Sequence, residues 1–201
     1  MKLYHCPDAR SLRPLWALEE MGLECELENM RFPPRFTYPD YLDINPMGTV
    51  PTFLDGDLTM TESSGICHYL VERYGPSDIG VYSDEPAYGE YLNWLYRSDA
   101  TLTFPQTIVL RYTHQEPEKG LHQAAEDYAI WYHSRLRAVE AALEGKEYLV
   151  ADRFTIADIA VGYALFLGIS LGLDERYKPN CKRYLARLME RDGFNRARAR
   201  Q

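Results

Sequence analysis

Residues 48–75, GTVPTFLDGDLTMTESSGICHYLVERYG, contain two short strand signals followed by a helix signal. The segment 50–62 predicts two antiparallel strands, because turn-forming Asp55-Gly56-Asp57 separates two runs of strand-forming residues. From Ser63 onward, apolar residues recur at helical spacing up to Tyr74. This β-β-α unit therefore closes the first part of the chain, where strand and helix signals alternate.

The residues before this unit alternate between the same two signals. MKLYHC at 1–6 is a short apolar strand, and 11–22 has apolar residues at helical spacing and ends at a glycine. Residues 23–30 alternate apolar residues with glutamates, which predicts a second strand, and 39–45 predicts a short helical turn. The resulting order, β-α-β-α-β-β-α, is the thioredoxin-like pattern, and it predicts a first domain over residues 1–75.

The chain changes character after this domain. Residues 76–86 are polar and rich in turn-formers, which predicts a linker. Strand signals then stop, and helices are predicted over 87–114, 118–144 and 155–172, the last of them apolar on nearly every face. Thr155 and Asp158 have the spacing of a capping box at its start. The predicted fold class is an α/β thioredoxin-like domain followed by an all-helical domain over residues 87–201.

Composition excludes several classes of function. The formal net charge is −8, which argues against a nucleic-acid partner, and no apolar run reaches the ~18 residues of a membrane span. The strand-like start, without a signal peptide, predicts a cytoplasmic protein. Four scattered cysteines lack the spacing of a disulfide framework or a zinc site. The basic residues near the end of the chain predict a solvated helix face and tail: Arg187, Arg191, Arg196, Arg198 and Arg200.

Three short motifs together carry a family resemblance. The first half contains TVPTF at 49–53 and ESSGICHYL at 62–70, and the helical half contains FTIADIAVGYAL at 154–165. In this order and spacing they resemble the cytosolic glutathione S-transferases of the bacterial type, over essentially the whole chain. The resemblance implies an enzyme that takes glutathione as co-substrate, requires no metal, and adds the bound thiolate to a small hydrophobic electrophile or uses it to reduce or isomerise one. It also implies a homodimer.

The resemblance assigns glutathione to residues of the opening stretch. A cis bond between Val50 and Pro51 is expected to turn the main chain of Val50 toward the ligand, so that glutathione adds to it as an extra strand would. Ser63 at the start of a helix is expected to hold the γ-glutamyl carboxylate, where free N–H groups and the helix dipole favour an anion. Glu62 is expected to pair with the γ-glutamyl ammonium.

The catalytic group is expected in the turn after the first strand, YHCPDARSLRPLW at 4–16, which fits the family pattern poorly. Arg10 stands where cysteine-type relatives have their catalytic residue. Ser11, with Arg10 beside it, is one candidate for stabilising the thiolate, and capping of the helix is its alternative role. Cys6 is the competing candidate, because CPDA resembles a C-P-x-A pattern of thiol transferases, although the short connection could turn it toward the core. Backbone N–H groups at the helix start are the third possibility.

The residues that contact the electrophile are the least specified. Tyr96, Phe104 and Tyr112 lie along the first long predicted helix and are expected to wall an apolar pocket, although such a stripe is also typical of a core. Two alternatives to a transferase stay open. One is a non-catalytic binding or dimerisation module of the same fold, and the other is a Cys6-dependent thiol transferase.

Overall fold

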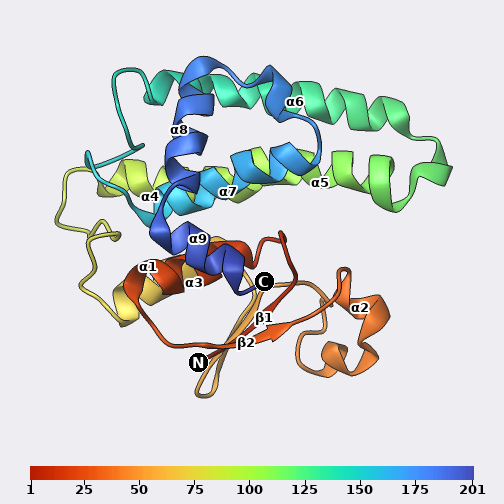
Figure 1. The fold of residues 1–201 in the computed structure, drawn as a ribbon, viewed down its shortest axis with the longest axis horizontal. Coiled ribbons are helices and arrows are strands. Elements are labelled where there is room, and N and C mark those ends of the chain that lie inside the picture. Colours follow the sequence, from red (N-terminus) through yellow and green to blue (C-terminus); the bar gives the residue numbers. More distant parts are fainter. The chain divides into compact units, whose positions relative to one another are not determined.

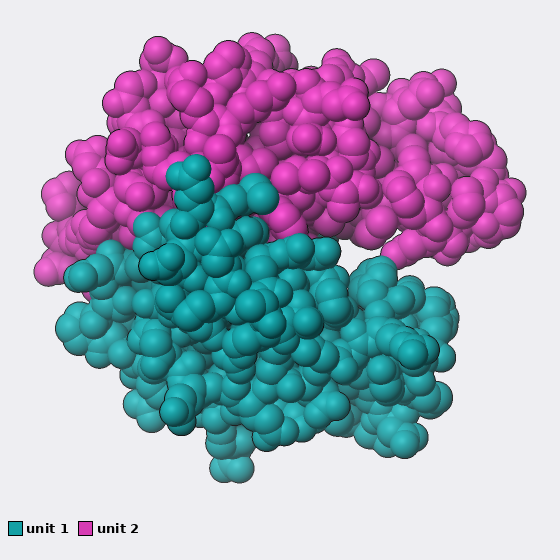
Figure 2. All heavy atoms as spheres, in the orientation of Figure 1, with its two compact units in different colours: residues 1–80, 189–201 teal, residues 81–188 magenta.

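The computed structural model describes residues 1–201 and divides them into two compact units. The first unit comprises residues 1–80 together with 189–201, and the second comprises residues 81–188 (Figure 2). No helix combines the length and the apolar content that a membrane span requires.

A mixed four-stranded sheet forms the centre of the first unit, in the order β2-β1-β3-β4. Its strands are β1 (Lys2–His5), β2 (Glu26–Asn29), β3 (Thr52–Asp55) and β4 (Leu58–Met60). β1 runs parallel to β2 and antiparallel to β3, and β3 and β4 form the hairpin expected around Gly56. With its helices, this sheet confirms the predicted thioredoxin-like fold.

Two helices lie together beside this sheet, α1 (Leu12–Met21) and α3 (Ser63–Arg73) (Figure 1). α1 ends as predicted at Gly22, which adopts a left-handed conformation with φ of 64° and donates its N–H to the carbonyls of Leu18 and Glu19. Each of the two helices has a buried face, and Leu3 and Phe53 of the sheet are fully buried. The connection between β2 and β3 contains the short α2 (Pro34–Thr37) and the 3-10 helix η1 (Pro39–Asp43).

The last helix, α9 (Asp192–Ala199), packs on α1 of the first unit rather than extending the helical domain. Phe194 meets the ring of Trp16 edge-on, with the ring centroids 5.0 Å apart. Gly193 permits this close approach, because an added Cβ would lie 2.5 Å from the carboxyl carbon of Glu20. The structure therefore differs from the expected domain over 87–201, since its last segment completes the first unit.

The basic residues of this segment stay partly exposed, as expected of a solvated face and tail, but they are also paired with carboxylates. Arg191 makes a bidentate contact with Glu20 at 2.7 and 2.9 Å. Arg196 and Arg200 both bind Glu19, at 3.1 and 2.6 Å. The partners of these arginines are the carboxylates of Glu19 and Glu20 at the end of α1. Neither the sequence of α1 nor that of α9 indicates that the two helices meet.

The second unit is helical throughout. Its helices are α4 (Tyr88–Arg97), α5 (Phe104–Leu110), α6 (His122–Ala142), α7 (Ile156–Ser170) and α8 (Pro179–Met189), with short 3-10 turns η4 (Pro117–Lys119) and η5 (Asp174–Arg176). Two π-helical segments, η2 (Ser98–Thr103) and η3 (Arg111–Gln115), interrupt the single helix expected over 87–114. Thr103 donates its hydroxyl to the Ser98 carbonyl at 2.6 Å, and Pro105 has no N–H to donate, so regular helical bonding is broken there.

The predicted capping box of α7 is confirmed. The Thr155 hydroxyl accepts a bond from the N–H of Ala157 at 3.2 Å, and Asp158 accepts one from the N–H of Thr155 at 2.8 Å. Asp158 also accepts bonds from the N–H of Leu149 and the hydroxyl of Tyr184. Burial raises the pKa of Asp158 to about 6. α7 is buried over most of its length, as expected of a central helix.

Candidate functional site

The loop before β3 carries two main-chain groups that the fold leaves without partners. The bond between Val50 and Pro51 is cis, as the resemblance implied. Strand pairing begins only at Thr52, and the N–H and C=O of Val50 make no hydrogen bond within the protein. The Val50 side chain is buried in a small apolar cluster with Cys6, Met30 and Tyr41. The side chain thus anchors the loop while the main-chain groups remain able to bind a ligand.

A polar network holds this loop in place. The buried Tyr41 donates its hydroxyl to the carbonyl of Thr49 at 2.7 Å and lies 2.6 Å from the hydroxyl of Thr52. Asn45 donates its amide to the same Thr49 carbonyl at 2.8 Å. Sequence reasoning missed both Tyr41 and Asn45, although both lie in the helical turn predicted over 39–45. Both bonds fix Thr49, the residue immediately before Val50. Because the loop is already ordered, it loses less conformational entropy when a ligand binds.

The start of α3 lies beside the same loop. Ser63 is the first helical residue and Glu62 takes the N-cap position, with an exposed side chain. β3 and β4 are antiparallel and their pairing ends with Phe53 and Met60, so the residues just before β3 and those just after β4 lie at the same end of the hairpin. This end of the hairpin therefore carries all four residues that the resemblance assigned to glutathione. We call these four residues, Val50, Pro51, Glu62 and Ser63, the cradle.

A buried arginine supports the cradle from α1. Arg13 is fully buried, and its Nη1 donates to the hydroxyl of Ser63 at 3.0 Å. A buried guanidinium requires partners, because leaving water costs several kcal/mol unless hydrogen bonds replace the hydration. Arg13 was not among the expected site residues. The signal in the sequence was a charge between Leu12 and Leu15, on the apolar face of the first helix.

The turn after β1 differs from the expectation for its catalytic side chains. Cys6 is fully buried, and burial raises the pKa of its thiol to about 12. Ser11 is also fully buried; its hydroxyl accepts a bond from the N–H of Cys6 at 3.3 Å and lies 3.5 Å from the carbonyl of Cys6. It makes no capping bond to α1. Among the three expected residues, only Arg10 has a partly exposed side chain.

The end of the chain fastens this turn. Asp8 adopts a left-handed conformation with φ of 58°, and its carboxylate forms an ion pair with Arg198. The side-chain oxygen of Gln201 accepts a bond from the N–H of Asp8 at 2.9 Å and lies 3.2 Å from Nε2 of His5. His5 is fully buried, and burial lowers its pKa to about 4. His5 is therefore neutral at neutral pH and donates to Gln201 from Nε2.

The residues expected to contact the electrophile lie on three different helical segments of the second unit. Tyr96 on α4 is 73% exposed, and Phe104 at the start of α5 is 50% exposed. Phe104 packs edge-on against Tyr128 of α6, with ring centroids 6.3 Å apart. Tyr112 lies in the π-helical segment η3, where the guanidinium of Arg111 covers its ring. No group of His, Cys, Asp and Glu side chains in the chain is arranged to hold a metal ion.

Comparison with known proteins agrees over both units. Residues 1–72 match the glutathione S-transferase N-terminal domain, and residues 106–192 match the glutathione S-transferase C-terminal domain. Glutathione S-transferase 3 of Schizosaccharomyces pombe is 25% identical over 94% of this chain and 83% of its own length.

Two solved structures show the same fold. One is the ternary complex of BphK, a bacterial glutathione S-transferase, with 25% identity, a TM-score of 0.87, and coverage of 100% of this chain and 98% of its own. The other is a glutathione transferase family member from Pseudomonas fluorescens, with 25% identity, a TM-score of 0.83, and coverage of 98% of this chain and 91% of its own.

Proposed function

Because the chain is an enzyme of the cytosolic glutathione S-transferase superfamily, we propose that it binds glutathione in the cradle and transfers the thiolate to a small hydrophobic electrophile. The observation that carries the proposal is the pair of unbonded main-chain groups on Val50, next to the start of α3. A peptide ligand supplies the complementary N–H and C=O groups, as in strand addition. The Pseudomonas relative was solved with two glutathione molecules bound, which supports the choice of ligand.

The γ-glutamyl end of glutathione is zwitterionic and needs both charges matched. Glu62 offers an exposed carboxylate to the ammonium, and the N–H groups at the start of α3 offer the positive end of a helix dipole to the carboxylate. The Ser63 hydroxyl accepts its bond from Arg13, so its own proton remains available to a ligand oxygen. Arg13 is thereby a positioning residue, since it fixes the orientation of that hydroxyl.

The glutathione sulfur requires a positive or hydrogen-bonding environment to ionise near neutral pH. We assign this role to Arg10 and the start of α1, because Arg10 is the partly exposed candidate of the turn. Ser11 acts on the turn instead: its hydroxyl bonds to the main chain of Cys6. Cys6 stays a buried thiol, which disfavours the alternative of a thiol transferase with a mixed disulfide on this residue.

The hydrophobic character of the electrophile rests on the aromatic residues of the helical unit. Tyr96 and Phe104 expose large apolar surfaces, which contact with a hydrophobic ligand would remove from water. Tyr112 extends the same set along η3. We extend the family resemblance to the assembly as well and propose a cytoplasmic homodimer. Light scattering at micromolar concentration is expected to give twice the chain mass, and a monomer mass would contradict the dimer.

Calorimetry with glutathione, followed by ultraviolet spectroscopy of the complex, tests the proposed function. We expect saturable binding and the absorbance of a thiolate at neutral pH, followed by conjugation of a chloronitrobenzene-type electrophile. The absence of glutathione binding would reject the proposal. Binding without thiolate absorbance or turnover would instead favour the non-catalytic module of the same fold.

A further inference from the structure

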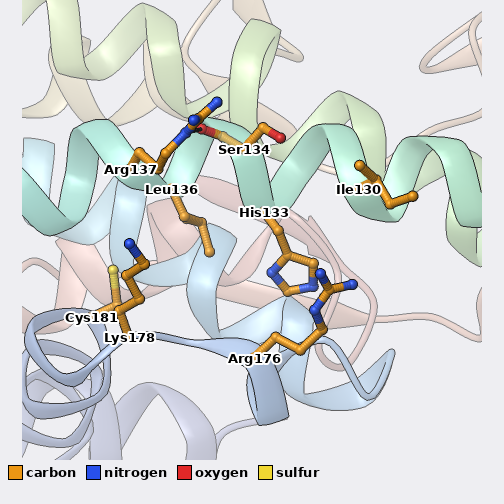
Figure 3. A pocket seen from close by; sticks show the side chains of 8 residues that line it. All are labelled: Ile130, His133, Ser134, Leu136, Arg137, Arg176, Lys178 and Cys181. Carbon is orange, nitrogen blue, oxygen red and sulfur yellow. Dashed lines mark hydrogen bonds between the residues drawn. The ribbon is translucent and has the colours of Figure 1, made fainter.

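The helical unit contains a cavity of about 290 Å³ that the proposed transferase reaction does not use. α6 forms one wall of it, and the segment from η5 to the start of α8 forms the other (Figure 3). Side chains of His133 and Leu136 extend from α6 toward Arg176 and Lys178 on the opposite wall (Figure 3). The cavity lies wholly within residues 130–181, so it belongs to the second unit alone.

The charged side chains that line this cavity all have the same sign. Arg137, Arg176 and Lys178 contribute to the lining, and no aspartate or glutamate does. None of the three makes an ion pair within the protein. The neighbouring carboxylate, Glu140, accepts bonds from the N–H groups of Asn180 and Cys181 at 3.1 and 3.0 Å. In a chain with a formal net charge of −8, such a grouping is a local exception; Lys178 has the carboxylate of Glu140 nearby, and an anion placed in the cavity would be attracted by all three positive side chains.

A histidine in the same wall has unused hydrogen-bonding capacity. Both ring nitrogens of His133 are buried and make no hydrogen bond. Its ring lies beside the guanidinium of Arg176 (Figure 3). Burial and the nearby charge of Arg176 lower the pKa of His133, so at neutral pH the ring carries one N–H donor. A buried donor without a partner costs about 1–3 kcal/mol, and an oxygen atom of a ligand in the cavity would recover this free energy.

We propose that this cavity binds the phosphate group of a small organic phosphate monoester. A guanidinium matches two phosphate oxygens, a lysine ammonium adds a point charge, and the His133 N–H supplies a further donor. A volume of about 290 Å³ exceeds what a phosphate ion needs, given that a water molecule occupies about 30 Å³ in the liquid. Ile130 and Leu136 add apolar surface to the lining, which suits the organic part of the ligand.

The test is calorimetric titration of the whole protein with two probes, inorganic phosphate and phenyl phosphate, at constant ionic strength and without glutathione. We expect phenyl phosphate to bind with a Kd of about 1 mM or tighter, and inorganic phosphate to bind more weakly. Equal affinities would overturn the assignment of an organic monoester and indicate the free ion. Saturable binding of neither probe would overturn the site altogether.

Two variants and a matched control locate the binding. Arg176→Gln and Lys178→Gln are each expected to weaken phenyl phosphate about tenfold, since each removes one charge-assisted contact. Lys146→Gln removes the same charge from an exposed position outside the cavity and is expected to change nothing. A similar loss in all three would mean nonspecific charge attraction and contradict the site.

A readout on the unmodified protein covers variants that fail to fold. Phenyl phosphate is expected to shift the ring nitrogen resonances of His133 in a protein labelled with ¹⁵N-histidine, and to leave those of His5 unchanged. Unshifted His133 resonances at saturating probe would place the phosphate elsewhere. Glutathione affinity is expected to be the same in Arg176→Gln as in the original protein, so this site and the transferase proposal fail independently.

Discussion

The cradle and the turn after β1 adjoin strands of the same sheet, yet they differ in the hydrogen-bonding groups that are free to bind a ligand. In the cradle, the main-chain groups of Val50 are unbonded, and Ser63 retains a proton to donate. In the turn, the hydroxyl of Ser11 bonds to the main chain of Cys6, and the Cys6 thiol is fully buried. The difference teaches that the cradle keeps main-chain groups available for the ligand we propose, whereas the side chains of the turn mainly maintain the conformation of the turn.

This comparison makes Arg13, which supports the cradle through Ser63, the residue whose loss is expected to have the largest effect. Arg13→Ala removes the donor to Ser63 and leaves a cavity beside α3. We expect the free energy of unfolding to fall by about 3–5 kcal/mol, as for other buried charged networks that lose one partner. Urea denaturation measures the loss. A loss below about 1 kcal/mol, the range of surface ion pairs, would show that the cradle does not depend on α1.

Protonation of His5, beside the turn, is expected to lower the free energy of unfolding in acid. The folded-state pKa of His5 is lowered to about 4, whereas the unfolded value is near 6.5. Between these values the unfolded state binds more protons, so stability is complete above pH 6.5 and decreases as the pH falls toward 4. The full loss is about 3 kcal/mol.

A His5→Asn variant isolates this effect. Asp158, whose pKa is raised to about 6, works in the opposite direction, because its folded state binds more protons between pH 4 and 6. The raw pH profile mixes the two groups. The difference in unfolding free energy between the original protein and His5→Asn is therefore the measurement, and it is expected to shrink as the pH falls from 6.5 to 4. A constant difference would contradict a neutral, buried His5.

Variants of Arg10 and Ser11 distinguish an effect on the ionisation of the bound thiol from an effect on the stability of the turn. Arg10→Ala is expected to raise the pKa of bound glutathione and to lower kcat about 10- to 100-fold, with little change in stability. Ser11→Ala is expected to cost about 1–3 kcal/mol of stability, since it leaves the buried N–H of Cys6 without a partner. Thiolate absorbance against pH distinguishes them. A raised thiol pKa in Ser11→Ala alone would return the catalytic role to Ser11.

A smaller effect is expected where the chain end meets the turn. Arg198→Ala breaks the ion pair with Asp8. Because both side chains of this pair are partly exposed, the free energy of unfolding is expected to fall by at most about 1 kcal/mol. We expect the KM for glutathione to rise, because the turn loses one of its contacts. The rise is expected to be small, because the N–H of Asp8 keeps its bond to Gln201. Steady-state kinetics at two salt concentrations measure it. A loss as large as that of Arg10→Ala would mean that α9 controls the catalytic turn directly.

Local patterns were sufficient to predict much of the fold. The turn at Gly56, the helix end at Gly22 and the capping box at Thr155 are all determined by residues within a few positions of one another. The packing of α9 was not predictable in this way. It depends on Glu19 and Glu20 meeting arginines about 170 positions later, and no periodicity within either segment records that contact.

The residues of the candidate site also differ in whether short motifs or long-range contacts determine their positions. Val50 and Ser63 were expected at the site because the short motifs TVPTF and ESSGICHYL resemble those of the family at these places. Ser11 and Cys6 could not be placed, because a shift of one residue in a turn decides whether a side chain points into the core or outward. Arg13 was visible as a charge on an apolar helix face, but its partner lies fifty residues away and only the fold supplies it.

The central claim is that the cradle holds the γ-glutamyl end of glutathione, and calorimetry of two matched variants of α3 tests it most directly. Glu62→Gln and Glu72→Gln make the same change of charge at opposite ends of one helix, and both side chains are exposed. The account predicts that Glu62→Gln weakens glutathione at least about tenfold, through the lost contact to the ammonium, while Glu72→Gln binds as the original protein does. Equal affinities in the two variants, with both folded, would contradict it.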